Sequence, residues 1–150
     1  MAVNDDGPEI AHSVLRGVIG AQAMSGMRTL TVYLGLADET PPKAILRQRA
    51  RGVLRKVPRK RRPAFIELFH WSVGAFAGAI YGALPDAVRR RAWSGPVYGL
   101  AVWAGYEAGI APMLGLSHAK KPRPVERLAF AADHLLYGLV LSEMRARPRR

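Results

Sequence analysis

Cysteine is absent from this chain of 150 residues, and acidic residues are few. Without cysteine the protein has neither disulfides nor thiolate metal sites, although histidine and carboxylate ligands remain open. The 23 Lys and Arg against 11 Asp and Glu leave a net charge of +12. Such a balance is typical of proteins that bind nucleic acid or an anionic membrane surface.

Sequence motifs of soluble enzymes are also missing. The chain has no Gly-x-Ser-x-Gly, phosphate-binding loop, HExxH or GxGxxG sequence. The sequence therefore predicts no catalytic residues and no cofactor, and we expect the protein not to be an enzyme. Residues 1–13 are polar and acidic, and they lack the features of a cleavable signal peptide.

Long apolar segments are what the chain has instead. Residues 64–84 and 94–116 reach the length of about 20 residues that a bilayer-spanning helix requires. Residues 14–36 and 128–144 are weaker candidates, because the first contains Arg28 and the second is short. We expect all 150 residues to form one all-α domain, a polytopic membrane protein with four transmembrane helices. The alternative is a soluble helical bundle rich in Ala and Gly.

A basic segment, residues 43–62, follows the first expected span. Apolar residues recur at helical spacing over 43–57, and Arg and Lys fill the remaining face. This pattern predicts a cationic amphipathic helix in the membrane interface, bound to anionic lipid headgroups. A nucleic-acid site is disfavoured because the segment has no aromatic side chains for stacking on bases. The expected lipid-binding residues are Arg47, Arg49, Arg51, Arg55 and Lys56.

Glycine recurs at intervals of four inside two of the expected spans. In lipid, small residues let helix backbones approach closely, so they are favoured where helices pack. We expect such packing faces in spans two and three, and these faces are also candidate contacts for a homo-oligomer or a larger membrane complex. The predicted packing residues are Gly74, Gly78, Gly82, Gly105 and Gly109.

The two halves of the chain resemble each other. The segment that begins at Gly17 aligns with the segment that begins at Gly95, and each ends in Leu-Gly-Leu, at 34–36 and 114–116. Farther on, His-x3-Gly occurs at residues 70–74 and again at 134–138. We interpret the chain as two tandem helical hairpins that enter the membrane in the same direction.

Six ionisable groups fall inside the expected spans, where such groups usually face the interior of the bundle and have partners. They are Arg28, Glu67, His70, Glu107, Asp133 and His134. Because Arg28 aligns with Glu107 in the repeat, we expect these two to form an ion pair, either as a structural salt bridge or as a gate.

The two histidines allow several interpretations. Glu67 and His70 have the E-x-x-H spacing of carboxylate-bridged metal sites, but such sites need a second E-x-x-H, and span four offers only Asp133 and His134. A metal site is therefore disfavoured. Both histidines could instead relay protons, or they could simply hydrogen-bond across helices.

A family resemblance follows from these features. With His70, the Gly-x3-Gly stripe, the Pro-Met-Leu-Gly-Leu sequence at 112–116 and the Asp-His-x3-Gly-x4-Glu sequence at 133–143, the chain resembles the YagU-like family of small bacterial inner-membrane proteins. The resemblance implies a multi-pass protein of the inner membrane that is linked to acid resistance and has no established molecular activity. The residues that carry it are His70, Pro112, Gly115, His134 and Glu143. The basic segment 43–62 departs from the family pattern.

Lys and Arg are more numerous in the linkers after spans one and three than in the termini and the remaining connector. By the positive-inside rule, both of these linkers face the cytoplasm. Two functions are then open: proton- or ion-linked membrane transport, and a non-catalytic membrane subunit or scaffold of a larger complex. A metal-dependent membrane enzyme is a third, weaker hypothesis.

Overall fold

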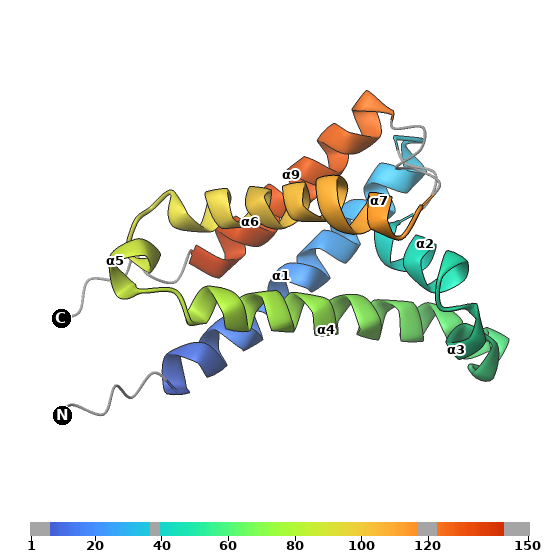
Figure 1. Cartoon of the computed structure of the whole chain (residues 1–150), viewed down its shortest axis with the longest axis horizontal. Helices are drawn as coiled ribbons and strands as arrows, with labels where there is room; N and C mark the ends of the chain where they lie inside the picture. The colour runs from blue at the N-terminus through green and yellow to red at the C-terminus, as the bar shows by residue number, and fades with distance from the viewer. Residues whose placement is uncertain (1–6, 37–39, 117–122, 143–150) are drawn as a thin grey trace.

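The computed structural model describes residues 7–36, 40–116 and 123–142, and every regular element in these ranges is a helix (Figure 1). The predicted all-α class is therefore confirmed. The elements in chain order are α1 (Gly7–Tyr33), α2 (Pro41–Gln48), α3 (Arg51–Lys56), the 3-10 turn η1 (Arg59–Arg61), α4 (Arg62–Gly82), α5 (Asp86–Arg89), α6 (Ser94–Gly105), the π-helical turn η2 (Tyr106–Ile110), α7 (Ala111–Met113) and α9 (Pro124–Ser142).

The long helices run up and down between two ends of the molecule. In Figure 1 the N-terminal end of α1, helix α5 and the C-terminal end of α9 lie at one end, while α2 and α3 lie at the other. Helices α6, η2 and α7 follow each other without a break from Ser94 to Met113. At about 1.5 Å per residue, this run and helices α4 and α9 are each long enough to match the apolar thickness of a bilayer.

Two helical hairpins make up the bundle, because α1 packs mainly along α4 and α6 packs mainly along α9. In both hairpins the two helix backbones approach each other closely at glycines. A Cβ on Gly17 would lie 2.3 Å from the carbonyl oxygen of Gly74, and a Cβ on Gly95 would lie 2.2 Å from that of Gly138. Gly17 and Gly95 occupy equivalent positions in the sequence repeat, and so do Gly74 and Gly138. The two hairpins are thus held by equivalent contacts.

The first long helix of each hairpin also ends in the same way. The amide of Gly35, at a φ of 70°, donates to the carbonyl of Val32, and the amide of Leu36 donates to that of Thr31. At the second Leu-Gly-Leu the amide of Gly115, at a φ of 57°, donates to the carbonyl of Pro112, and the amide of Leu116 donates to that of Ala111. Only glycine takes this left-handed conformation without strain, so each Leu-Gly-Leu stops its helix.

The expected glycine contacts are met in span two and not in span three. Gly74, Gly78 and Gly82 all lie against α1, whereas a Cβ added at Gly105 or Gly109 would have no atom within 4 Å. The prediction for Gly105 and Gly109 as contacts within the bundle is wrong. Helix α9 contacts the first half of α6 instead, and the residues that approach it there are Gly95 and Gly99.

The single interfacial helix predicted over 43–57 is also wrong, because the segment forms two short helices. Helix α2 ends at Gln48, and α3 begins at Arg51 after Ala50 leaves the helical conformation. Leu46 in α2 and Leu54 in α3 are both buried. The break lets each short helix bury one leucine while most of the basic side chains stay at the surface.

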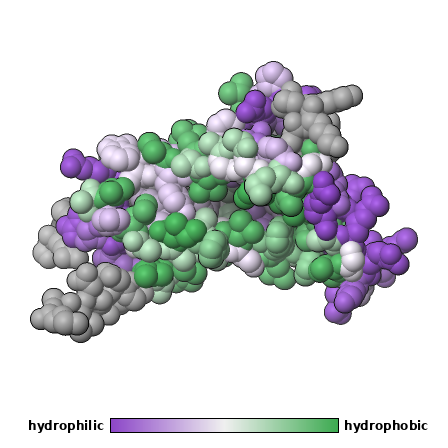
Figure 2. Space-filling model, in the orientation of Figure 1, coloured by the Kyte–Doolittle hydropathy of each residue, from purple (hydrophilic) through white to green (hydrophobic). Residues whose placement is uncertain are grey.

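Apolar side chains cover the middle of the molecule, and charged ones gather at its ends (Figure 2). Within the described ranges, one stretch of 24 residues, Arg59–Gly82, is long and apolar enough by length and composition to cross a membrane. The buried aromatic side chains lie between the hairpins, where the rings of Tyr81 and Tyr98 are 5.0 Å apart and pack beside Met24 and Tyr137.

Candidate functional site

A buried polar cluster joins three helices at one level of the bundle. Arg28 of α1 donates through Nε to Oδ2 of Asp133 on α9 at 3.3 Å and through Nη1 to Nε2 of His70 on α4 at 3.0 Å. All three side chains are buried, and Asp133 is fully buried. Placing the guanidinium between a carboxylate and a neutral acceptor gives it two of the partners that a buried cation requires.

Ser25 and Glu67 extend this cluster along α1 and α4. The hydroxyl of Ser25 lies 3.2 Å from Nδ1 of His70 and donates to Oε2 of Glu67 at 2.5 Å. Ser25 lies one helical turn before Arg28, so both side chains face α4. Ser25 was not predicted from the sequence. Its spacing of three from Arg28, which places both side chains on the same helix face, could have indicated it.

The partners of His70 assign its tautomer. A guanidinium only donates hydrogen bonds, so Nε2 of His70 must accept the bond from Arg28. Nδ1 therefore carries the proton and faces the Ser25 oxygen, which can accept it while donating to Glu67. In this arrangement the imidazole is neutral, and it links the carboxylate of Glu67 to the Arg28 guanidinium through Ser25.

Glu107 lies outside this cluster, and the predicted pair between Arg28 and Glu107 is wrong. Oε2 of Glu107 is 3.3 Å from Nε of Arg127, at the start of α9. Beside α1 at the level of Arg28 lies α9, so the carboxylate that meets the guanidinium is Asp133. The alignment of the halves therefore paired Arg28 with a residue of the wrong helix.

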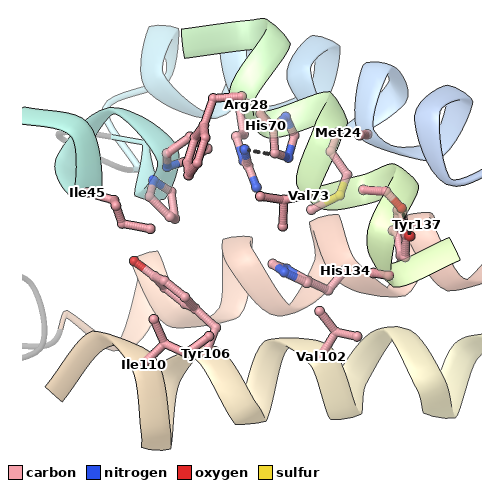
Figure 3. A pocket seen from close by; sticks show the side chains of 16 residues that line it. Met24, Arg28, Ile45, His70, Val73, Val102, Tyr106, Ile110, His134 and Tyr137 are labelled. Atoms are coloured by element: carbon pink, nitrogen blue, oxygen red, sulfur yellow. Dashed lines mark hydrogen bonds between the residues drawn. The ribbon is translucent and has the colours of Figure 1, made fainter. Parts of the chain in front are cut away.

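His134, the remaining member of the predicted set, points into a cavity of about 140 Å³ (Figure 3). All four long helical segments and α2 contribute to the walls of this cavity. Its polar lining residues are Arg28, His70, Tyr106, His134 and Tyr137, and its apolar ones include Met24, Ile45, Val73, Val102 and Ile110. The cavity therefore brings both repeated histidines to one apolar space.

Two tyrosines hold the hairpins together by hydrogen bonds to α4. The hydroxyl of Tyr137 on α9 donates to the carbonyl of Gly74, and that of Tyr98 on α6 donates to the carbonyl of Ala77, both at 2.6 Å. Both carbonyls belong to α4. A Cβ on Gly20 of α1 would lie 2.7 Å from Cδ2 of Tyr137, so this glycine makes room for the tyrosine ring.

A second group of charges lies at the end of the bundle that carries α5. Arg89 forms ion pairs with Glu9 of α1 and with Asp86, and Arg90 lies 3.0 Å from the other oxygen of Asp86. Hydrogen bonds from Arg90 and Arg89 lower the pKa of Asp86 below its usual value of 3.8. This group, in which Arg89 is buried and Asp86 is exposed, ties the start of α1 to the connector between the hairpins.

At the opposite end, each linker contacts the glycine turn of the other hairpin. The guanidinium of Arg49 covers Gly115, since a Cβ there would lie 2.5 Å from Nη2 of Arg49. Arg123 in turn donates to the carbonyl of Gly35 at 3.5 Å. Arg49 thus contacts the protein itself, and so does Arg51, whose Nε donates to the carbonyl of Arg47 at 2.8 Å. Both side chains are exposed, as are those of Arg55 and Lys56 of α3.

Pro112 and Gly115, which also carry the family resemblance, lie apart from the cavity. Pro112 is exposed in α7, and Gly115 forms the turn that ends that helix. Glu143 lies outside the described residues. Within the described ranges no three His, Asp or Glu side chains are grouped so that they could hold a metal ion.

No protein family, curated protein or solved structure matches this chain.

Proposed function

We propose that the chain is a multi-pass membrane protein of the bacterial inner membrane, in which α1, α4, the α6–η2–α7 run and α9 each cross the bilayer. The support is a reversed distribution of polarity. Large apolar side chains are exposed along all four segments, while Arg28, His70 and Asp133 are buried between them. A protein that folds in water places such groups the other way round, and lipid favours this arrangement. Exposed examples are Leu15, Ile19, Leu68, Phe76, Val97, Ile110, Leu128 and Leu139.

The charges at the two ends support the same proposal. Basic side chains of α2, α3 and η1 lie at one end, and the Arg89 group lies at the other (Figure 2). Both ends would then lie at the headgroups of the bilayer, where arginine and lysine bind anionic lipid.

Labelling of single cysteines tests the four crossings, and the absence of native cysteine removes any background. We expect His12→Cys and Val88→Cys to react with an impermeant maleimide from one side of the membrane, and Arg51→Cys from the other. Phe76→Cys, in the middle of α4, should not react from either side. Labelling of Arg51→Cys and Val88→Cys from the same side would contradict the proposal.

For the activity we propose a non-catalytic membrane subunit or scaffold, whose polar groups hold the bundle together. The observation that carries this proposal is the geometry of the Arg28 cluster. It joins α1, α4 and α9 to one another, and a fixed positive charge lies at its centre. A guanidinium in that position repels protons and cations. The open face at Gly105 and Gly109 is available to a second copy or to a larger membrane complex.

Proton- or ion-linked transport, with the acid-stress role that the family resemblance implies, is the second candidate. The observation that favours it is His134, whose imidazole faces the cavity rather than another side chain. The imidazole of a histidine that faces an open cavity can accept and release a proton there.

Flux measurements in proteoliposomes separate the two candidates. For a scaffold, proton and ion flux should equal that of protein-free vesicles, and His70→Ala or His134→Ala should lower the melting temperature only. Flux above this background that His134→Ala abolishes would overturn the scaffold proposal and support transport. Crosslinking in native membranes, followed by mass measurement, then shows whether the scaffold binds a second copy or a larger complex.

A further inference from the structure

The cavity between the hairpins has the size of a small ring. Its volume of about 140 Å³ is close to that of engineered apolar protein cavities of about 150 Å³ that bind benzene. Val73 and Ile110, which line it, are each about half exposed, so the cavity reaches the apolar surface of the bundle. A molecule dissolved in the surrounding lipid could therefore enter it.

His134 gives this apolar space one unsatisfied hydrogen-bond acceptor. Nδ1 of His134 lies 2.8 Å from the carbonyl of Phe130, and because a carbonyl only accepts, Nδ1 must carry the proton. Nε2 of the neutral ring is then unprotonated, and its lone pair can accept a hydrogen bond. No hydrogen bond to it is formed within the described ranges, although the side chain is only 9% exposed and points into the cavity (Figure 3).

The charges on the cavity wall favour a neutral ligand. The positive charge of Arg28 is balanced by Asp133, and its Nη1 already donates to His70. An anion in the cavity would have to compete with Asp133, and a second cation would be repelled by Arg28. Nε2 of His134 can instead accept a hydrogen bond from an uncharged donor, such as a hydroxyl group.

We propose that this cavity binds a small neutral molecule with a ring-sized apolar body and one hydroxyl group, which donates its hydrogen bond to Nε2 of His134. A phenolic compound dissolved in the bilayer has this chemistry. The apolar body would contact Val102 and Met24, and the hydroxyl would satisfy Nε2 of His134, which has no hydrogen-bond partner within the described ranges. The inference does not depend on whether the protein transports anything.

Phenol and toluene are matched probes, because they have nearly the same size and differ in the hydroxyl group. We would measure their binding to the full-length protein in nanodiscs by calorimetric titration and subtract their partition into empty nanodiscs. Phenol is expected to bind about fivefold more tightly than toluene, the effect of one net hydrogen bond. His134→Phe, which keeps a ring but removes the acceptor, should abolish this preference.

A second pair of variants locates the binding site. Val73→Phe fills the mouth of the cavity and should weaken the binding of both probes, whereas Val97→Phe, at an equally exposed position outside the cavity, should change neither. Equal affinity of phenol and toluene, or a phenol preference that survives His134→Phe, would overturn the proposal. Binding that Val73→Phe leaves unchanged would also overturn it. If His134→Phe does not fold, the comparison of Val73→Phe with Val97→Phe still tests the proposal.

Discussion

Arg28 shows how a charged side chain is stabilised inside this bundle. Its guanidinium is 6% exposed and lies between Asp133 and His70, which come from two different helices. A charge removed from water is tolerated only when an opposite charge and hydrogen bonds replace its hydration. The cluster therefore fixes how α1, α4 and α9 lie relative to one another at this level.

Removing the carboxylate should destabilise the protein strongly. We expect Asp133→Asn to lower the free energy of unfolding by about 3 kcal/mol, because it leaves the buried guanidinium without its counter-charge. The double variant Arg28→Met with Asp133→Leu removes both charges and should recover most of this loss. The measurement is unfolding of the detergent-solubilised protein followed by circular dichroism. An Asp133→Asn protein as stable as the wild type would contradict the role given to the pair.

At the other end of the molecule, the contribution of Asp86 to stability should depend on pH. Its pKa is lowered by hydrogen bonds from Arg90 and Arg89, so the ionised form is favoured in the folded state. Its contribution to stability is therefore complete above the unfolded pKa near 4 and is lost as the pH falls through the lower folded pKa.

The difference in melting temperature between wild type and Asp86→Asn should accordingly be constant from pH 7 to about pH 5 and should shrink toward pH 3. Asp86 is exposed, so the difference should be small at every pH. A difference that grows on acidification would show that the ion pairs with Arg89 and Arg90 do not stabilise the folded state.

Each hairpin depends on glycine where its two helices cross. In the second hairpin a Cβ on Gly99 would lie 2.0 Å from the carbonyl oxygen of His134, and one on Gly95 would meet Gly138. No real Cβ comes so close, so any side chain here forces the helices apart. The same requirement in the first hairpin explains why Gly17 and Gly74 occupy the corresponding positions of the repeat.

Alanine at two positions of the same helical run should therefore have opposite effects. We expect Gly99→Ala to destabilise the protein by about 1–3 kcal/mol through overpacking. Gly105→Ala meets no atom within 4 Å and should be neutral, or stabilising by up to about 1 kcal/mol through helix propensity. Unfolding by titration with a denaturing detergent measures both. If Gly99→Ala is as stable as Gly105→Ala, the helices of the second hairpin do not cross at this residue.

On the scale of the whole molecule, charge is distributed unevenly between the ends. Among the described residues, the end that carries α2, α3 and η1 has most of the exposed basic side chains, and Arg49 and Arg123 connect the two hairpins there. Anionic lipid at this end would neutralise the repulsion between these groups. Its binding would then stabilise the folded bundle by mass action.

Exchange of neutral for anionic lipid in nanodiscs should therefore raise the melting temperature. Arg55→Ser with Lys56→Ser, both exposed on α3, should reduce this rise. The matched control, Arg90→Ser with Arg91→Ser at the α5 end, should reduce it less, because fewer basic groups surround it. An equal reduction in the two variants would show that the α3 end is not the preferred site for anionic lipid.

Much of the secondary structure could be predicted because its signals are local. The predicted spans end at residues 36 and 116, three residues beyond the ends of α1 at Tyr33 and α7 at Met113, and at both places a glycine with positive φ closes the helix. The break of the basic segment after Gln48 was missed. Nothing in the order of its residues shows that Leu46 and Leu54 must both be buried against other parts of the fold.

The candidate site was predicted only in part. Their place in apolar segments predicts that four ionisable side chains face the interior of the bundle, namely Arg28, His70, Asp133 and His134. The alignment of the two halves then paired Arg28 with Glu107, but equal depth in two repeats does not say which helices touch. Tyr137 was not foreseen either, since its hydrogen bond goes to a backbone carbonyl of another helix.

The sequence by itself determined the helical class, the glycine turns and the separation of apolar middles from basic ends, because each depends on residues close together in the chain. The tertiary structure decided that α9 rather than α6 lies beside α1, and with it the partner of Arg28. It also decided that the lone pair of His134 faces a ring-sized cavity. Such contacts depend on how whole helices cross, and their packing involves residues more than a hundred positions apart.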